Sequence, residues 1–318
     1  MGRKTLVTVL IPSYNHAPYI SQSIRSVLEQ DWSHIDLVVI DDGSSDSSPQ
    51  IIRSLLEHRT DCQYIMRKNL GVIHTLNEGV AMARGEFLCF LASDDYLLQG
   101  SVRIRAEYLQ AHPDCIAVFA DYISVLADGT AHEPFPSEKT QRLFQSTDPI
   151  REFIEGANIP LHTLMVRTSV FREIGAFDPR FHFCEDLDVQ VRLFLSGKVD
   201  YIDECVRCYR RHDTNISIAK RCHFTADQIL CLQKYLYEMP ELAPYRKIIR
   251  RRLTHKYRTL GKHLNSVSKG YPWEEDLFNR AWQFAWRDCR LLWRLMRWTV
   301  NRKVLRKGSR LKRHKLGE

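Results

Sequence analysis

Gly85-Glu86-Phe87-Leu88-Cys89-Phe90-Leu91-Ala92-Ser93-Asp94-Asp95 contains an apolar run that ends at two adjacent carboxylates. The run from Phe87 to Leu91 has the length of a buried strand. In open α/β sheets, ligands bind beyond the carboxyl ends of the strands, so Asp94 and Asp95 are expected at a ligand-binding edge. Two like charges there favour a hard divalent cation as the counter-charge. The simpler alternative is an acidic turn that caps the next helix.

Strands and helices alternate on both sides of this stretch. The alternation predicts an α/β fold, with a mostly parallel sheet, right-handed crossovers and helices on both faces. Three strand ends, at Pro12-Ser13-Tyr14, Asp41-Asp42 and Asp94-Asp95, would then meet at one edge of the sheet. The expected strands are 6–11, 35–40, 62–66, 87–91 and 116–120, and the expected helices are 17–30, 49–57, 72–83 and 99–111.

The pattern loosens after residue 120. Residues 130–163 are mixed and contain four prolines, which suits a segment that shapes a substrate pocket or a plain surface excursion. A helix is expected from Glu185 through Leu195, and the chain reads as helix from Phe224 onward. Short strands are expected at 164–167, 199–202 and 206–209.

Length and composition bound the class of protein. At 318 residues and 44% hydrophobic, the chain has room for a catalytic domain and an appendage. No apolar run reaches the roughly 18 residues that span a bilayer, and the N-terminus leads into a strand without a signal-peptide pattern. The nine scattered cysteines suit free thiols in a reducing compartment. We therefore expect a cytoplasmic protein.

The net charge of +8 is unevenly distributed. Residues 246–318 carry 22 Lys and Arg against 5 Asp and Glu, a net charge of +17, whereas residues 1–245 carry a net charge of −9. An acidic body with a basic tail indicates an anionic surface as a partner. The acidic body argues against nucleic acid, so a membrane is the expected surface.

The sequence lacks the glycine-rich loops that hold phosphates. Neither a G-x-G-x-x-G pattern after the first strand nor a P-loop is present. A nucleoside diphosphate bound at this sheet edge would therefore need a metal ion.

A set of short motifs, in a fixed order, resembles the inverting family 2 glycosyltransferases of the GT-A fold. The resemblance covers about residues 5–217 and differs from the common family pattern at Ala92, where many members have another aspartate. Its parts are Val9-Leu10-Ile11-Pro12-Ser13-Tyr14-Asn15, Asp41-Asp42-Gly43-Ser44-Ser45-Asp46, Asn69-Leu70-Gly71, Asn77, Gly85-Glu86, Ser93-Asp94-Asp95, Glu185-Asp186, and Arg210-Arg211-His212 with Asn215 and Ser217.

The resemblance implies a role for each matching residue. Asp95 would hold a divalent cation, Mn²⁺ or Mg²⁺, together with Asp94 and His212, although His212 is equally well explained as a structural loop residue. Asp186 would be the general base, and Glu185 is a second candidate. The residues implied in nucleotide-sugar binding are Pro12, Tyr14, Asn15, Asp42, Asn69, Asn77 and Asp94.

The implied activity is transfer of a sugar from a nucleotide-sugar, a UDP-sugar above all, to a hydroxyl of a glycan or lipid-linked acceptor. Surface polysaccharide or glycolipid synthesis is the expected setting. A sugar-phosphate nucleotidyltransferase, whose fold is related, is a second alternative. It would require a glycine-rich basic loop after the first strand, and Pro12-Ser13-Tyr14-Asn15 is not such a loop. A non-enzymatic nucleotide-sugar-binding module is the third alternative. The expected domains are a catalytic domain at 1–218 and a basic helical region at 219–318.

The basic tail contains an amphipathic pattern. On a helical wheel, Arg287, Arg290, Arg294 and Arg297 form one stripe, which is edged by tryptophans. Such a pattern suits an anionic bilayer interface on the inner face of the cell membrane. The alternative is a helix packed on protein with its arginines outward. The tryptophans are Trp282, Trp286 and Trp293.

Overall fold

The computed structural model describes residues 5–134, 137–157, 159–212 and 221–266, and the chain divides into two compact units. The first unit comprises Met1–Ala219 with Glu241–Tyr245, and the second comprises Lys220–Pro240 with Arg246–Glu318. The predicted boundary at residue 218 falls outside the described residues and stays a prediction, as does the amphipathic pattern at 282–297.

Four parallel strands form one half of the sheet in the first unit, in the order β3-β2-β1-β4. Apolar runs explain them, because β1 and β2 are buried almost throughout. The elements of this half are β1 (Val7–Ser13), α1 (Ala17–Leu28), β2 (Ile35–Asp41), α2 (Ser48–Leu56), β3 (Cys62–Met66), α3 (Val72–Met82) and β4 (Phe87–Phe90).

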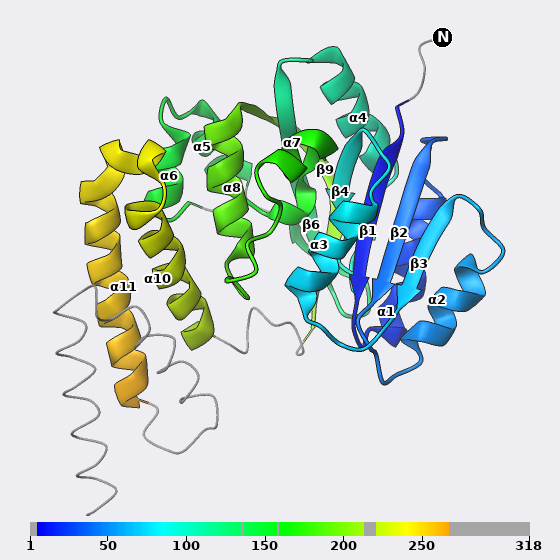
Figure 1. Ribbon diagram of the computed structural model, residues 1–318. Helices are drawn as coiled ribbons and strands as arrows, with labels where there is room; N and C mark the ends of the chain where they lie inside the picture. The colour runs from blue at the N-terminus through cyan, green and yellow to red at the C-terminus, as the bar shows by residue number, and fades with distance from the viewer. Residues whose placement is uncertain (1–4, 135–136, 158, 213–220, 267–318) are drawn as a thin grey trace, which may run out of the picture. The chain divides into compact units, whose positions relative to one another are not determined.

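Helices cover both faces of this half (Figure 1). Val7, Val9 and Ile11 of β1 belong to one buried cluster with residues of α1 and α2. On the opposite face, α3 approaches β1 so closely that a Cβ atom at Gly79 would lie 2.2 Å from the Leu10 side chain. The alternation of β1 side chains between two covered faces accounts for its uniformly apolar sequence.

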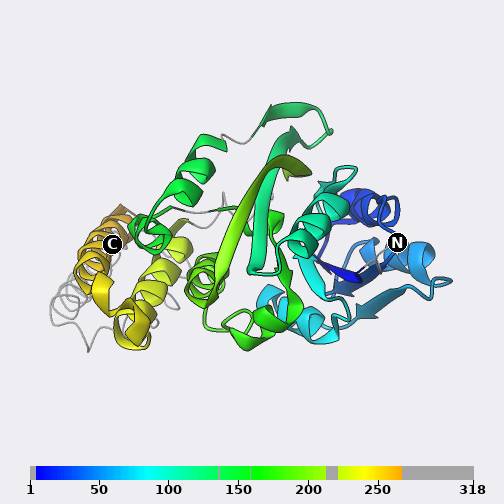
Figure 2. The ribbon, with the colours of Figure 1, turned by 90° about the horizontal axis from the view of Figure 1, so that it is seen from above.

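The other half of the sheet is mixed, and it continues the order as β4-β8-β6-β9-β5. β8 pairs antiparallel with both β4 and β6, whereas β6 and β9 run parallel and lie side by side (Figure 2). β7 is antiparallel to β6, and β5 to β9. These strands are β5 (Tyr96–Leu97), β6 (Cys115–Leu126), β7 (Ala131–Pro134), β8 (Met165–Arg167) and β9 (Lys198–Arg211).

Helices not predicted from the sequence fill the segment between β7 and β8. They are α5 (Ser137–Gln145), α6 (Pro149–Glu155) and the 3₁₀ helix η1 (Leu161–Thr163). Asp148 caps α6 by accepting a hydrogen bond from the Arg151 amide at 3.1 Å. The remaining helices of the first unit are α4 (Ser101–Ala111), α7 (Thr168–Glu173) and α8 (Glu185–Ser196).

The described residues of the second unit form the helices α10 (Arg221–Tyr237) and α11 (Arg246–Ser266). The 3₁₀ helix η2 (Pro240–Tyr245) lies between them in sequence, and its residues Glu241–Tyr245 belong to the first unit. The helices α10 and α11 pack through buried apolar residues such as Ile229, Tyr235 and Ile249. Gln233 donates a hydrogen bond to the Tyr257 hydroxyl at 2.9 Å. None of the helices in the described residues is long and apolar enough to cross a membrane.

Candidate active site

Hydrogen bonds join the loop that follows β1 to the loop that follows β2. The Asn15 amide donates to Ser44 Oγ at 2.8 Å, and Asn15 Oδ1 accepts from the Ser45 amide at 2.8 Å. Asn15 has a φ of 52°, a left-handed conformation that asparagine tolerates better than most residues. Asp46 accepts a hydrogen bond from the Ala17 amide, at the first residue of α1. The two strand ends thus form one rigid edge.

Asp42, predicted to bind the nucleotide, fixes the neighbouring loop. Its carboxylate accepts hydrogen bonds from the amides of Leu70 (2.8 Å) and Gly71 (2.9 Å) and contacts the Arg67 guanidinium. The loop passes so near Gly43 that a Cβ atom there would lie 2.7 Å from the Asn69 amide nitrogen. Asp42 and Asn69 therefore lie on one side of the edge.

His16, Asp94 and His212 bring three metal-binding side chains together, and in the described residues they form the one cluster of this kind. One potential ligand atom from each lies within 4.8 Å of the others. His212 Nε2 is 3.0 Å from Asp94 Oδ2, and His16 Nε2 is 4.0 Å from the same oxygen. The structure thus places two predicted residues, Asp94 and His212, beside His16, which was not predicted.

The chemistry of this cluster fits a divalent metal. His16 Nδ1 hydrogen-bonds with Ser93 Oγ at 2.7 Å, which orients the ring and leaves Nε2 facing Asp94. Burial lowers the pKa of His16, opposed by the nearby Asp94 carboxylate, so the imidazole is neutral at neutral pH and able to bind a metal. Two imidazoles and one carboxylate suit a transition ion such as Mn²⁺ better than Mg²⁺.

Asp95 has partners different from those predicted for a metal ligand. It is buried, its Oδ2 pairs with the buried guanidinium of Arg207, and its Oδ1 accepts a hydrogen bond from the Arg210 amide at 2.7 Å. Although adjacent in sequence, Asp94 and Asp95 have different neighbours: the Asp94 side chain lies beside His212, and the Asp95 side chain pairs with Arg207. A cation thus already neutralises Asp95, whereas Asp94 lies beside the two histidines.

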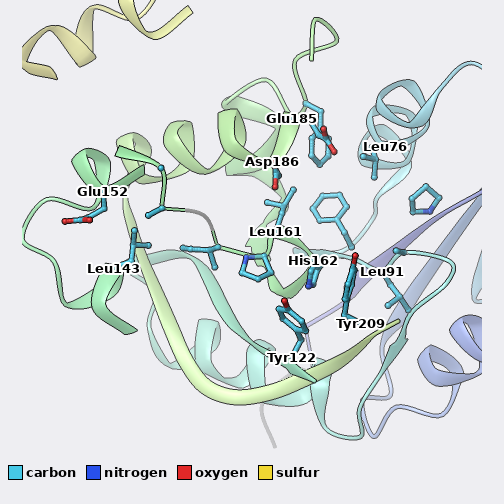
Figure 3. A pocket seen from close by; sticks show the side chains of 18 of the residues that line it. Leu76, Leu91, Tyr122, Leu143, Glu152, Leu161, His162, Glu185, Asp186 and Tyr209 are labelled. Carbon is cyan, nitrogen blue, oxygen red and sulfur yellow. The ribbon is translucent and has the colours of Figure 1, made fainter. Parts of the chain in front are cut away.

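A cavity of about 1,030 Å³ opens beside this edge of the sheet. Pro12 and Ala92 line it at the ends of β1 and β4, and Leu143 and Glu152 line it on α5 and α6 (Figure 3). The volume is at the upper end of the range for small-molecule sites, so it offers room for more than one sugar unit. The segment 130–163, predicted either to shape a substrate pocket or to be a plain surface excursion, thus contributes residues to a cavity.

Glu185 and Asp186, the two candidate bases, also line the cavity. Both lie in the first turn of α8, where the helix dipole favours the ionised form of a carboxylate. Asp186 Oδ1 accepts a hydrogen bond from the Leu187 amide at 2.7 Å. In Figure 3 the two carboxylates project from α8 into the cavity.

Other predicted residues are placed differently. Asn77 forms two hydrogen bonds with the backbone of Phe177, at 2.8 and 3.0 Å, and so supports a residue of the cavity wall. Tyr14 is half-exposed at the end of β1, where a base could stack on its ring.

The cavity lining also includes Tyr122, His162 and Tyr209, which were not predicted as site residues. Burial lowers the pKa of His162 to about 4, and burial raises the pKa of Tyr122 to about 12, so both are uncharged at neutral pH. No local sequence signal marks them, because they come from β6, η1 and β9. His16, by contrast, directly follows the motif at the end of β1 and could have been named as a ligand.

Comparison with known proteins identifies the family. The family model for glycosyl transferase family 2 matches residues 8–175. The chain belongs to glycosyl transferase family 2. This confirms the predicted family and, with it, the predicted class of enzyme. The putative teichuronic acid biosynthesis glycosyltransferase TuaG of Bacillus subtilis is 27% identical over 220 residues, which cover 68% of this chain and 83% of TuaG.

Solved structures confirm the GT-A fold. The chain is similar to residues 1–349 of Staphylococcus aureus TarS in complex with UDP-GlcNAc (TM-score 0.61, 19% identity, 88% of this chain and 80% of that one). It is also similar to the mannosyltransferase PcManGT of Pyrobaculum calidifontis in complex with GDP-Man and Mn²⁺ (TM-score 0.60, 17% identity, 94% of this chain and 87% of that one). The chain spans slightly less than two thirds of the length of several curated relatives.

Proposed function

We propose that this member of the family transfers a sugar from a nucleotide-sugar to an acceptor hydroxyl with inversion at the anomeric carbon. The observation that carries the proposal is the cluster of His16, Asp94 and His212 at the edge of the sheet. Two residues before Asp94, Ala92 lines the cavity that also contains Asp186. A site for a diphosphate and a candidate base thus belong to one pocket region.

The donor diphosphate is assigned to the metal cluster. A divalent cation held by His16, Asp94 and His212 would supply positive charge against the negative charge of the leaving diphosphate. The absence of a glycine-rich phosphate loop after β1 is consistent with this arrangement. PcManGT, the similar structure, binds Mn²⁺ with its donor, and we propose Mn²⁺ or Mg²⁺ for this chain.

The nucleoside is assigned to the loops after β1, β2 and β3. Tyr14 offers a ring for stacking, and Asp42 with Asn69 offers acceptors and donors for a base and ribose. We propose uridine as the base, since TarS, with the same fold, binds UDP-GlcNAc. Pro12 and Asn15 would contact the donor where β1 ends.

Asp186 is assigned as the general base. It would accept the proton of the acceptor hydroxyl while that oxygen attacks the anomeric carbon and the bond to the diphosphate breaks on the opposite side. One displacement of this kind inverts the configuration and needs no covalent intermediate. Glu185, beside it in the first turn of α8, is the second candidate.

The acceptor is proposed to be a glycan or a lipid-linked glycan in surface polysaccharide or glycolipid synthesis. TuaG, the relative from Bacillus subtilis, is named for teichuronic acid biosynthesis. The exposed residues of α11 include Arg246, Lys247, Arg250 and Arg251. With the basic residues that follow, α11 would hold the protein to the inner face of an anionic membrane.

A thermal-shift panel tests the donor assignment. UDP, GDP and their sugar conjugates are each added to the full chain with Mn²⁺, with Mg²⁺ or with EDTA. A ligand at 100 times its Kd adds roughly 2.7 kcal/mol of stability. We expect stabilisation by UDP and UDP-sugars that depends on the metal. Equal stabilisation in EDTA would contradict the metal, and stabilisation by GDP alone would contradict uridine.

A further inference from the structure

Tyr122, His162 and Tyr209 form an aromatic wall of the cavity. The rings of His162 and Tyr209 are stacked, with centroids 5.5 Å apart and planes 7° apart. The Tyr122 ring meets the His162 ring edge to face, with centroids 4.9 Å apart. The three residues come from different elements, so only the fold assembles this wall, and we call it the aromatic wall.

Within the described residues, His162 Nε2 is buried without a hydrogen-bond partner. A buried polar atom left unpaired is costly, so such atoms call for a functional explanation. The imidazole is neutral at neutral pH, because burial lowers its pKa. His162 lines the cavity, so a side-chain adjustment of the kind that is common on binding could bring Nε2 into contact with a ligand there.

Two buried arginines hold the backbone behind this wall. Arg207 Nη1 donates to the His162 carbonyl at 3.0 Å, and Arg105 Nη1 donates to the Thr163 carbonyl at 3.0 Å. Both guanidinium groups are almost fully buried. The wall is therefore preorganised, which is what a specific binding surface requires.

The chemistry of the aromatic wall selects its ligand. Flat rings bury the apolar C–H face of a pyranose, while hydroxyls and a neutral imidazole can pair with sugar hydroxyls. The wall itself presents no cation for a phosphate. A lipid chain has no polar group to pair with His162 Nε2, so it would leave that atom without a hydrogen bond. In Figure 3, Asp186 projects toward the cavity from α8 on the side opposite Tyr122 and Tyr209, so a sugar between them would present a hydroxyl to the base.

We propose that the aromatic wall binds the reacting sugar unit of the acceptor, an uncharged pyranose, and that His162 is a specificity-determining residue. The proposal rests on the proposed function, because it takes Asp186 as the base. It narrows the acceptor to a molecule whose attacking hydroxyl belongs to a saccharide. An alkyl phosphate or a lipid alcohol does not meet these contacts.

Saturation-transfer NMR on the full chain with UDP and Mg²⁺ tests this subsite. The probes are the methyl glycosides of glucose, galactose, mannose and N-acetylglucosamine, with octyl phosphate as the competing class. We expect at least one methyl glycoside to receive saturation from the wild type. His162→Phe keeps a ring but removes Nε2, so it should weaken that binding by about tenfold. His58→Gln, at an exposed histidine, should leave it unchanged.

The UDP signal in each sample separates the possible failures. If UDP binds and no methyl glycoside does, or if octyl phosphate alone binds, the subsite proposal is wrong while the donor proposal stands. Unchanged glycoside binding in His162→Phe also overturns it. If that variant loses UDP binding through misfolding, Tyr209→Phe, which lacks one hydroxyl, replaces it and should weaken glycoside binding with the UDP signal intact. Loss of UDP binding by the wild type would instead contradict the proposed function.

Discussion

The guanidinium of Arg207 pairs with the carboxylate of Asp95 in the interior of the first unit, where the two side chains are 0% and 1% exposed. The same arginine hydrogen-bonds with the His162 carbonyl, and the same aspartate accepts a hydrogen bond from the Arg210 amide. One buried ion pair thus connects the strand end that carries Asp94 with the aromatic wall of the cavity.

Breaking this pair should destabilise the protein. Burial lowers the pKa of Arg207 to about 10, so the side chain remains charged at neutral pH. Arg207→Met leaves Asp95 buried without its counter-charge, which typically costs about 3–5 kcal/mol. Urea denaturation measures the loss. Arg103→Met, which removes the exposed partner of Asp31, is the matched control and should change little.

A double variant separates charge from packing. Arg207→Met with Asp95→Leu removes both charges, so it should lose less stability than Arg207→Met alone. If Arg207→Met unfolds at the wild-type urea concentration, the ion pair does not have the structural role assigned to it.

Substitution of the base should abolish most of the transfer. Asp186→Asn keeps the size of the side chain but cannot accept a proton, so kcat should fall by about 10²-fold or more. Donor binding should change little, because the donor's contacts are assigned to other residues and Asn keeps the size of the Asp186 side chain. Steady-state kinetics with calorimetric UDP binding measures both. An active Asp186→Asn beside an inactive Glu185→Gln would mean that the two roles are exchanged.

His162 should make stability depend on pH. Its pKa is about 4 in the folded chain against an ordinary value of 6.5, so between these values the unfolded chain binds more protons. Stability should therefore fall as the pH drops from about 6.5 to about 4, by up to about 3 kcal/mol. Urea midpoints of wild type and His162→Phe measure the difference, since other groups titrate in both. Parallel curves would show that His162 is not held neutral by burial.

The basic C-terminal region, residues 246–318, should bind anionic membranes. Each Lys or Arg near such a surface contributes about 1 kcal/mol, and salt screens the attraction. The full chain should sediment with vesicles of phosphatidylcholine and phosphatidylglycerol, but weakly with phosphatidylcholine alone. Changing Arg287, Arg290, Arg294 and Arg297 to Gln should release it and leave UDP binding intact. Equal sedimentation of the variant and the wild type would favour a tail packed on protein.

Apolar runs made the parallel half of the fold predictable. β1, β2 and β4 are short, buried and separated by amphipathic helices, and their ends meet at one edge as expected. The mixed half of the sheet was harder to predict from the sequence. β9 was expected as two short strands, but it is continuous past the exposed Asp203 and Glu204, where bulges in its pairing with β6 accommodate them.

The candidate site also has a part that the sequence predicted and a part that it did not. Motif order singled out Asp94, Asp95, Asp186 and His212 as candidates, yet the surroundings of two adjacent aspartates cannot be told apart by sequence alone. Arg207, more than 100 residues away, decides that Asp95 turns inward and leaves Asp94 beside the histidines. This long-range ion pair depends on the strand order β6-β9-β5 in the sheet, and no local sequence pattern predicts that order.

Electron paramagnetic resonance of Mn²⁺ measures metal binding at His16, Asp94 and His212. Titrating Mn²⁺ into the full chain with UDP follows the signal of the free ion, which decreases on binding. We predict that the wild type and the control His58→Gln bind Mn²⁺ equally, whereas Asp94→Asn and His16→Gln each bind at least tenfold more weakly. Wild-type affinity in Asp94→Asn would show that Mn²⁺ does not bind at this cluster.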